Sequence, residues 1–267
     1  HIDITPQTGT LTYTRFFVAS ATTTFVTFFS AGDSVQSISV DNISVKEVTA
    51  LTTASGDYYQ STVDGKFYRL WKNQFKNSNN FSSADWATVG SLAIVSDTNE
   101  TTDPFGGNKA SKITNTGNSG VRQSGTAVGT GSIYVKAGVG TRFTICMGVN
   151  YADSTEFDLV TGTVLRVGTA NAAATISPAG NGWWRLAVTK AGAAPSAVRI
   201  GYVDSGAVVN DYCYIYAAQV ELGSTATAYE AKGADGSVSE TFRGNKADFP
   251  RLAGIVAEAA SVTIYDL

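Results

Sequence analysis

The sequence contains few of the side chains on which catalytic and metal sites most often depend. Among its 267 residues there are one histidine, His1, and two cysteines. Because His1 stands alone, catalysis of the Ser-His-Asp or Cys-His type is excluded, and so are zinc sites with several histidine ligands. Cys146 and Cys213 lie inside apolar strand-like runs. We expect them to pack as small hydrophobic side chains rather than to form a disulfide.

Charged residues are also scarce, and long apolar runs are missing. Asp, Glu, Lys and Arg make up 15% of the chain and the net charge is −3, so we expect no nucleic-acid partner. No apolar run approaches the roughly 20 residues of a membrane-spanning helix, and we expect no membrane span. The chain starts at His1 without a signal-peptide pattern and stops at Leu267 inside an apolar run. We interpret it as a piece of a longer polypeptide.

Helical periodicity is almost absent, and short strand-like runs take its place. The one stretch that could be helical, 253–260, is short and continues into β-branched residues. Elsewhere, runs of β-branched and aromatic residues alternate with turns of Gly, Asn, Asp and Ser, which is typical of all-β proteins. The longest coherent unit is 73–232, where many short strands at regular spacing predict a jelly-roll β-sandwich.

The predicted fold is therefore all-β, with one complete unit and two shorter flanking parts. Residues 1–48 are expected to be the terminal strands of a partial second β-sandwich module. Residues 49–72 are expected to form a hairpin or linker, because two aromatic runs flank an Asp-Gly turn. After the jelly roll at 73–232, residues 233–267 are expected to form a short β-rich C-terminal connector.

Five motifs of the 73–232 unit follow one another in a characteristic order. They are NQFKNSNNFSSADW, SIYVKAG, FDLVTGTV, GNGWWRLAV and YIYAAQVELGSTATAYE. Together they resemble the carbohydrate-binding-module-like jelly-roll domain of bacteriophage tail and other virion proteins, and VDNISVKEV, before residue 49, is similar to the last strand of a related module. The resemblance covers Asn73 to about Glu230. It implies a β-sandwich displayed on a virion, and thus a virion or extracellular location, but not a particular sugar ligand.

Two adjacent tryptophans in GNGWWRLAV raise the question of a ligand site. Strand alternation places Trp184 with Leu186 and Val188 on the core face, and Trp183 with Arg185 on the other face. An exposed Trp183 could stack on a sugar while Arg185 donates hydrogen bonds to its hydroxyls. Alternatively, Trp183 lies under a neighbouring loop with its indole N–H bonded to a carbonyl. We favour this structural role.

Three tyrosines alternate along the strand predicted to end this unit. Alternation places them on one side with the apolar residues that follow, and places Gln219 and Glu221 on the opposite side, which we expect to face solvent. The tyrosines should therefore belong mostly to the core. If their side were a groove open at one end, they would form a row on which sugars stack. The candidate ligand-binding residues are thus Trp183, Arg185, Tyr212, Tyr214 and Tyr216.

Acidic residues offer the remaining routes to catalysis or metal binding. Glu156 and Asp158 share a strand face, but nothing in their spacing indicates an acid with a raised pKa, so we expect no catalytic residue and no enzyme. Loops at 97–103, 150–154 and 208–211 are rich in Asp and Asn. They could hold a structural Ca²⁺, but solvated turns are favoured, and we assign no metal ligand and no other cofactor.

These observations lead to one leading function and two alternatives. We expect a non-enzymatic structural protein of a phage tail fibre, spike or appendage that presents jelly rolls for host attachment. Its expected partners are other virion proteins and host-surface glycans, and the resemblance suggests a homo-oligomer, specifically a trimer. The hairpin 56–71 and the tail 249–267 are expected to contact other chains. The alternatives are a carbohydrate-binding module or adhesin of a secreted bacterial polysaccharide-degrading protein, and a purely architectural virion decoration protein.

Overall fold

The chain folds into β-strands arranged in three sheets. The computed structural model describes residues 51–53, 56–60, 66–124, 129–192, 195, 197–203, 205–243 and 261–267. These residues form strands and one short 3-10 helix, η1 (Tyr151–Asp153), and none of them belongs to a helix that could cross a membrane. The predicted all-β sandwich is therefore confirmed. The expected module at 1–48 and the ambiguous stretch 253–260 lie outside the described residues.

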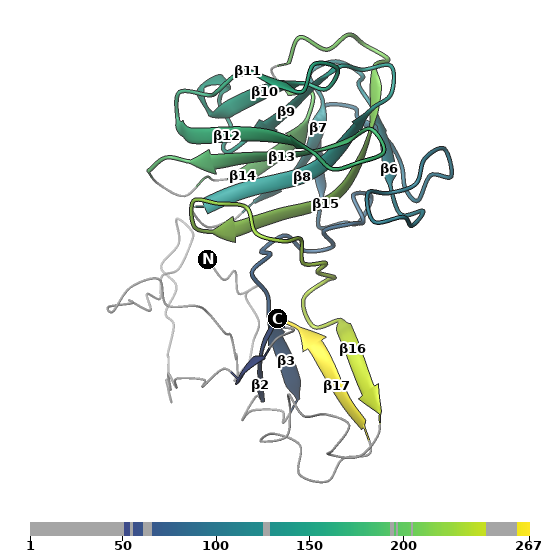
Figure 1. Cartoon of the computed structure of the whole chain (residues 1–267), viewed down its shortest axis with the longest axis vertical. Coiled ribbons are helices and arrows are strands. Elements are labelled where there is room, and N and C mark those ends of the chain that lie inside the picture. The colour runs from purple at the N-terminus through teal and green to yellow at the C-terminus, as the bar shows by residue number, and fades with distance from the viewer. Residues whose placement is uncertain are drawn as a thin grey trace, which may run out of the picture.

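Two six-stranded antiparallel sheets form the sandwich (Figure 1). The first, called the β14 sheet, contains in spatial order β11 (Thr163–Arg166), β10 (Ser154–Asp158), β9 (Arg142–Cys146), β14 (Ala197–Gly201), β7 (Gly120–Ser124) and β4 (Ala87–Val89). The second, called the β15 sheet, contains β12 (Asn171–Pro178), β13 (Trp183–Lys190), β8 (Gly129–Ala137), β15 (Tyr212–Leu222), β6 (Ser111–Thr114) and β5 (Ala93–Val95). The chain crosses between the sheets from β6 to β7 and again from β7 to β8, which is typical of jelly rolls.

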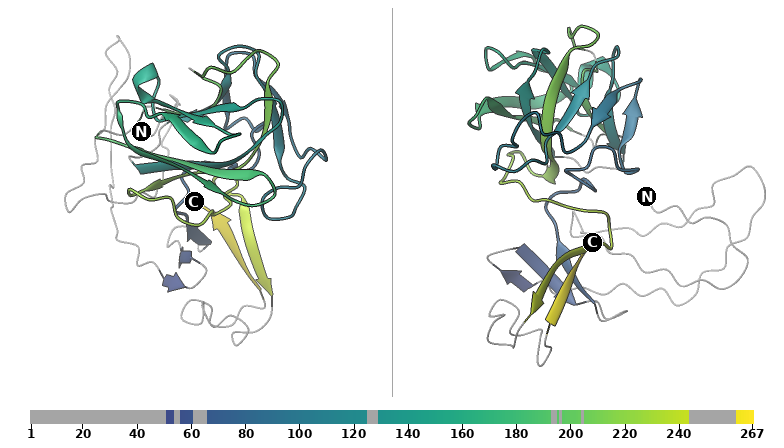
Figure 2. Two further views of the ribbon diagram at one scale, coloured as in Figure 1. Left: turned by 45° about the horizontal axis from the view of Figure 1, so that its top comes forward. Right: turned by 90° about the vertical axis from the view of Figure 1, so that its right-hand side faces the viewer.

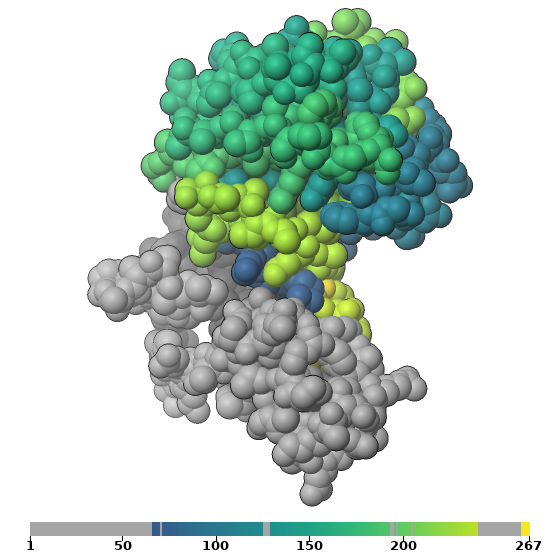
Figure 3. Space-filling view, viewed as in Figure 1, coloured from purple at the N-terminus to yellow at the C-terminus, as the bar shows by residue number. Residues whose placement is uncertain are grey.

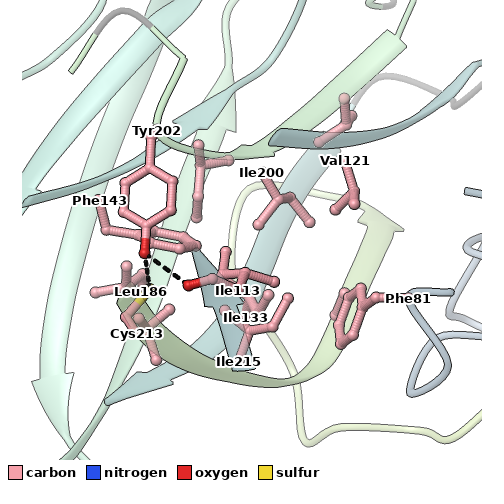
Figure 4. Packing of buried hydrophobic residues seen from close by; sticks show 14 of the residues in the cluster. Phe81, Ile113, Val121, Ile133, Phe143, Leu186, Ile200, Tyr202, Cys213 and Ile215 are labelled. Carbon is pink, nitrogen blue, oxygen red and sulfur yellow. Dashed lines mark hydrogen bonds between the residues drawn. The ribbon is translucent and has the colours of Figure 1, made fainter. Parts of the chain in front are cut away.

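The core lies between these two sheets and takes apolar side chains from both. Leu186 of β13 sits opposite Ile133 of β8 in the strand register, and both are completely buried. Fully burying such a side chain contributes about 1.5–3 kcal/mol. The core also contains a polar contact, because the Tyr202 hydroxyl donates to the Ile113 carbonyl (3.1 Å) and lies 3.0 Å from the Cys213 sulfur (Figure 4).

Both cysteines are buried and free, as the sequence predicts. Burial raises the pKa of the Cys213 thiol to about 12. A thiol that stays protonated at neutral pH is a poor nucleophile, so Cys213 acts in this fold as a packing side chain.

A smaller five-stranded sheet lies beyond the sandwich and joins the two flanking parts of the chain (Figure 2). Its strands are, in spatial order, β1 (Leu51–Thr53), β2 (Gly56–Gln60), β3 (Phe67–Leu70), β17 (Ser261–Asp266) and β16 (Val238–Arg243). The predicted hairpin is present as the antiparallel pair β2–β3, and β3 pairs in parallel with β17. The hairpin and the tail, both expected to contact other chains, thus pair with each other within one chain.

The sandwich is inserted between β3 and β16, and the chain enters and leaves it at neighbouring points. The backbone N–H groups of Asn77 and Ser78 donate to the carbonyls of Gly233 and Lys232, each at 2.9 Å. Asp266, only 2% exposed, joins both sides of this junction. Its carboxylate accepts from the Trp71 indole (2.8 Å), from Gly233 N–H (3.0 Å) and from the Ser237 hydroxyl (2.7 Å).

Candidate functional site

The candidate site lies on the face of the β15 sheet that points away from the core, here called the outer face. Two segments cover parts of this face (Figure 3). One is the loop 97–109 between β5 and β6, and the other is the segment 223–232, which follows β15. These two segments decide which of the predicted ligand-binding residues can meet a ligand.

The adjacent tryptophans open β13 and point to opposite faces, as alternation predicts. Trp184 packs against the core and donates its indole N–H to the Leu159 carbonyl (2.8 Å). Trp183 lies on the outer face, but it is only 1% exposed and donates its indole N–H to the Thr102 carbonyl (3.0 Å). Because the loop 97–109 covers the Trp183 ring, the ring is not an exposed surface for a sugar. Trp183 instead has the structural role that we favoured, under a loop and hydrogen-bonded to a carbonyl.

A β-bulge in β15 reverses the faces that simple alternation assigns to the tyrosines. The register shifts between Tyr216 and Gln219, and Ala217 adopts a left-handed φ of +57°. A bulge adds one residue to one strand, so the side chains before and after it exchange faces. The expectation that the tyrosines share the core side with Ala218 is therefore corrected, because they lie on the outer face. The core residues of β15 are Cys213 and Ile215 before the bulge, and Ala218 and Val220 after it.

Two of these tyrosines help to fasten the loop 97–109 to the sheet. Tyr214 is 8% exposed, packs against Trp183, and donates its hydroxyl to Glu100 Oε2 (2.9 Å). Lys112 Nζ lies 2.9 Å from the same oxygen and 4.0 Å from the centre of the Tyr212 ring. The hydrogen bonds from Lys112 and Tyr214 lower the pKa of Glu100, whereas burial and then the Glu100 carboxylate raise that of Tyr214. This network leaves Tyr214 no free surface for a ligand.

Gln219 and Glu221 lie on the outer face but are buried, which corrects the expectation that they face solvent. They are 0% and 2% exposed. The Glu221 carboxylate accepts from Gln219 Nε2 (2.7 Å) and from the Thr227 N–H (2.8 Å) and hydroxyl (2.6 Å). The Glu230 N–H donates to Gln219 Oε1 (2.8 Å). Their polar groups therefore hold the segment 223–232 on the sheet, since buried polar groups need partners.

Arg185 also serves this covering segment rather than an open site. Its guanidinium donates through Nη2 to the Ser132 hydroxyl (3.3 Å) and to the Thr227 carbonyl. Its Cζ lies 5.5 Å from the centre of the Tyr134 ring. The Nη2 atom is therefore engaged, and the Nε atom is buried without a hydrogen-bond partner. Donation from Nη2 to a sugar would have to replace contacts inside the chain.

The tip of the loop 97–109 is held in one conformation by a buried carboxylate. Asp103 is 2% exposed and accepts from the backbone N–H groups of Phe105 (2.9 Å), Gly107 (3.0 Å) and Lys109 (3.3 Å). A β-carbon on Gly107 would lie 2.5 Å from Asp103 Oδ2. A side chain at this position would therefore displace the Asp103 carboxylate from its present place. Hydrogen bonds from several N–H groups to one carboxylate make the tip rigid.

This rigid tip presents Phe105 above a group of aromatic side chains on the outer face. Phe105 is 61% exposed. Its ring centre lies 5.4 Å from that of Tyr134, 5.9 Å from that of Tyr216 and 6.3 Å from that of Tyr229. Tyr134, Tyr216 and Tyr229 are half-buried. These four residues, called the Phe105 cluster, form an exposed aromatic surface that a ligand can reach.

Only Tyr216 of the Phe105 cluster was among the predicted site residues. Tyr134 lies on β8, and Phe105 and Tyr229 lie on the two covering segments, far apart in the sequence. The one local signal was PFGG inside an Asp- and Asn-rich loop, where a large aromatic residue has no strand to pack into. Such a residue in a turn is a reason to consider a binding surface.

The acidic pair Glu156 and Asp158 has structural partners. Glu156 accepts from the Gly206 N–H (2.8 Å) and lies 3.5 Å from the Arg142 guanidinium. The Asp158 carboxylate accepts from the N–H groups of Val160 (2.8 Å) and Thr161 (3.1 Å). These bonds, chiefly that from Thr161, lower the pKa of Asp158. A general acid at neutral pH requires a raised pKa instead.

The Asp- and Asn-rich loops use their carboxylates within the fold. Besides Asp103, Asp153 pairs with Lys190, and Asp211 accepts from the Val208 N–H (2.9 Å). Within the described ranges, no group of three or more His, Cys, Asp or Glu side chains is arranged to hold a metal ion. The contacts seen in these loops are those of hydrogen-bonded turns.

No protein-family model matches this chain, and no curated protein is significantly similar to it. The resemblance to virion jelly rolls therefore rests on the five sequence motifs. In the structure, SIYVKAG lies on β8, GNGWWRLAV forms the turn before β13 and most of that strand, and YIYAAQVEL follows β15 through its bulge. Three of the five motifs thus lie on β8, β13 and β15, which are neighbours in one sheet of the sandwich.

Proposed function

We propose that this chain is a non-enzymatic part of a virion appendage, a tail fibre or spike, that attaches to host-surface glycans through the Phe105 cluster. The observation that carries the proposal is the Phe105 ring, 61% exposed yet fixed in place by the Asp103 turn. Exposed aromatic rings are costly in water and suit a flat apolar ligand face, such as that of a sugar ring. A pre-organised ring loses little conformational entropy on binding. The five motifs supply the virion part of the proposal.

Binding to immobilised glycans tests this function, with the full chain compared with two variants. Phe105→Ala removes the exposed ring. Tyr151→Ala is a matched control, because Tyr151 is also 61% exposed but contacts Arg166 of the β14 sheet, away from the cluster. We expect Phe105→Ala to weaken glycan binding about tenfold or more, while Tyr151→Ala binds like the unchanged chain. Both variants should change stability by only about 0.5 kcal/mol.

A second candidate function is a purely architectural virion part that binds no sugar. It is favoured by the burial of Trp183 and Tyr214, which the two covering segments remove from solvent. The same experiment distinguishes the two functions. Absence of binding to every glycan, or equal binding by the Phe105→Ala variant, would contradict attachment through the cluster. The first of these results would leave the architectural role.

A further inference from the structure

The ionised groups around the Phe105 cluster form hydrogen bonds or ion pairs within the chain. Asp103 accepts three backbone N–H groups, and Arg185 donates to Ser132 and Thr227. Lys109 pairs with Asp97 at 2.9 Å within the loop 97–109, and Lys112 of β6 pairs with Glu100 of the same loop. Lys136 Nζ donates to the Thr101 hydroxyl (3.0 Å). Lys136 and Arg185 have only neutral partners, and so do the carboxylates of Asp103 and Glu221. A charged ligand arriving here would therefore meet fixed charges of both signs.

One neutral polar group in the cluster has no partner within the described part of the chain. The Tyr134 hydroxyl makes no hydrogen bond there, and it is not one of the buried unpaired polar atoms, so it reaches solvent. The other two tyrosine hydroxyls differ. Tyr229 donates to Asn79 Oδ1 (2.7 Å), and Tyr216 accepts a long hydrogen bond from Asn79 Nδ2 (3.4 Å).

An exposed aromatic ring beside a free phenol hydroxyl favours one class of ligand. The ring offers a flat apolar surface, and the hydroxyl can both donate and accept a hydrogen bond. A neutral pyranose sugar presents C–H groups on its ring faces and hydroxyls around its rim, which match these two features. Lys109 and Lys112 are paired with carboxylates, and the charges of Lys136 and Arg185 are offset by the carboxylates of Asp103 and Glu221, so an acidic sugar meets no net positive charge here.

We infer that the Phe105 cluster selects neutral pyranose sugars over acidic ones, with Tyr134 as a specificity-determining residue whose hydroxyl bonds a sugar hydroxyl. The inference rests on the proposed function, because it assigns a ligand class to the same site. Phe105 supplies the stacking surface and Tyr134 the directional contact. The network around Tyr214 and Glu100 only holds the loop in place.

The test compares binding of the full chain to neutral polymers (dextran, mannan and galactan) and to acidic polymers (polygalacturonate and polysialic acid). The variants are Tyr134→Phe, which removes only the hydroxyl, and Tyr151→Phe as a control at a distant exposed tyrosine. We expect binding to at least one neutral polymer, weakened about threefold to tenfold by Tyr134→Phe, as loss of one hydrogen bond implies. Tyr151→Phe should leave the affinity unchanged. Neither variant should lower Tm, because the Tyr134 hydroxyl has no partner in the described fold.

The possible results separate this inference from the proposed function. Tighter binding to the acidic polymers would overturn the inference and leave glycan attachment standing. Neutral-polymer binding that Tyr134→Phe does not change, but Phe105→Ala abolishes, would remove Tyr134 from the contact. Absence of binding to all five polymers and to a wider glycan array would overturn both.

Discussion

At the scale of single residues, the sandwich depends on carboxylates that accept several hydrogen bonds at once. Asp153 is an example, because Lys190 Nζ contacts its Oδ1 and the N–H groups of Val149 (3.2 Å) and Asn150 (3.1 Å) donate to its Oδ2. The two charged side chains are 10% and 11% exposed. Burial alone would raise the pKa of Asp153, but the bonds from Lys190 and Asn150 outweigh it and lower the pKa.

We predict that Asp153→Asn destabilises the protein at neutral pH and that the difference shrinks in acid. A carboxyl whose pKa is lowered on folding stabilises the fold fully above its unfolded pKa, which is about 3.9. This contribution disappears as the pH falls through the lower, folded-state pKa. Urea denaturation at about pH 6 and about pH 2.5 measures both differences in the free energy of unfolding. Equal differences at the two pH values would contradict the prediction. Asp97→Asn, in an exposed pair with Lys109, is the control and should have a smaller effect.

At the scale of elements, the sequence predicts the strands well but not the faces of β15. Alternation holds through β13, where Trp184 and Leu186 face the core as expected. In β15 the added residue at Ala217 breaks alternation, and an alanine at a positive φ has no sequence signature. Gln219 and Glu221 follow the bulge and are buried beneath a segment that comes later in the chain. Such coverage depends on tertiary contacts, so local pattern alone could not reveal it.

The Phe105 cluster could not be predicted for the same reason. Its four rings come from the loop 97–109, from β8, from β15 and from the segment 223–232. Apart from Phe105 in its turn, each residue is unremarkable in its own stretch of sequence. What brings them together is the pairing of β8 with β15 and the attachment of both covering segments to the outer face.

We predict that the loop 97–109 loses its fixed tip when Asp103 is replaced. Asp103→Ala removes the acceptor for three backbone N–H groups and should cost about 1–3 kcal/mol of stability. Asp103→Asn keeps one carbonyl oxygen and should cost less. Hydrogen exchange of the amides of Phe105 and Gly107 should accelerate in the order wild type, Asn, Ala. Glycan affinity should fall in the same order as the protection of these amides from exchange. Unchanged exchange in Asp103→Ala would show that other contacts hold the tip.

At the scale of the whole molecule, the parts predicted as hairpin and connector form one sheet. The sandwich is inserted between them in the sequence. The parallel pairing of β3 with β17 joins residues nearly 200 positions apart, as in Tyr68 opposite Tyr265. A strand pattern predicts neither the partner nor the direction of such a pair, because both depend on how the long intervening chain folds. At the junction between this sheet and the sandwich, the backbone N–H groups of Asn77 and Ser78 donate to the carbonyls of Gly233 and Lys232.

We predict that the sandwich folds without the small sheet. Among the described residues, those of its core lie between Phe75 and Val220, and backbone hydrogen bonds hold its two ends together, so a fragment of residues 72–233 keeps these core residues. It loses the contacts that Asp266 makes with Trp71 and Gly233. The fragment should therefore unfold cooperatively, with a Tm within a few degrees of the sandwich transition in the full chain. Asp266→Ala should lower the stability of the small sheet more than that of the sandwich. A fragment without a cooperative transition would show instead that the five-stranded sheet is needed to fold the sandwich.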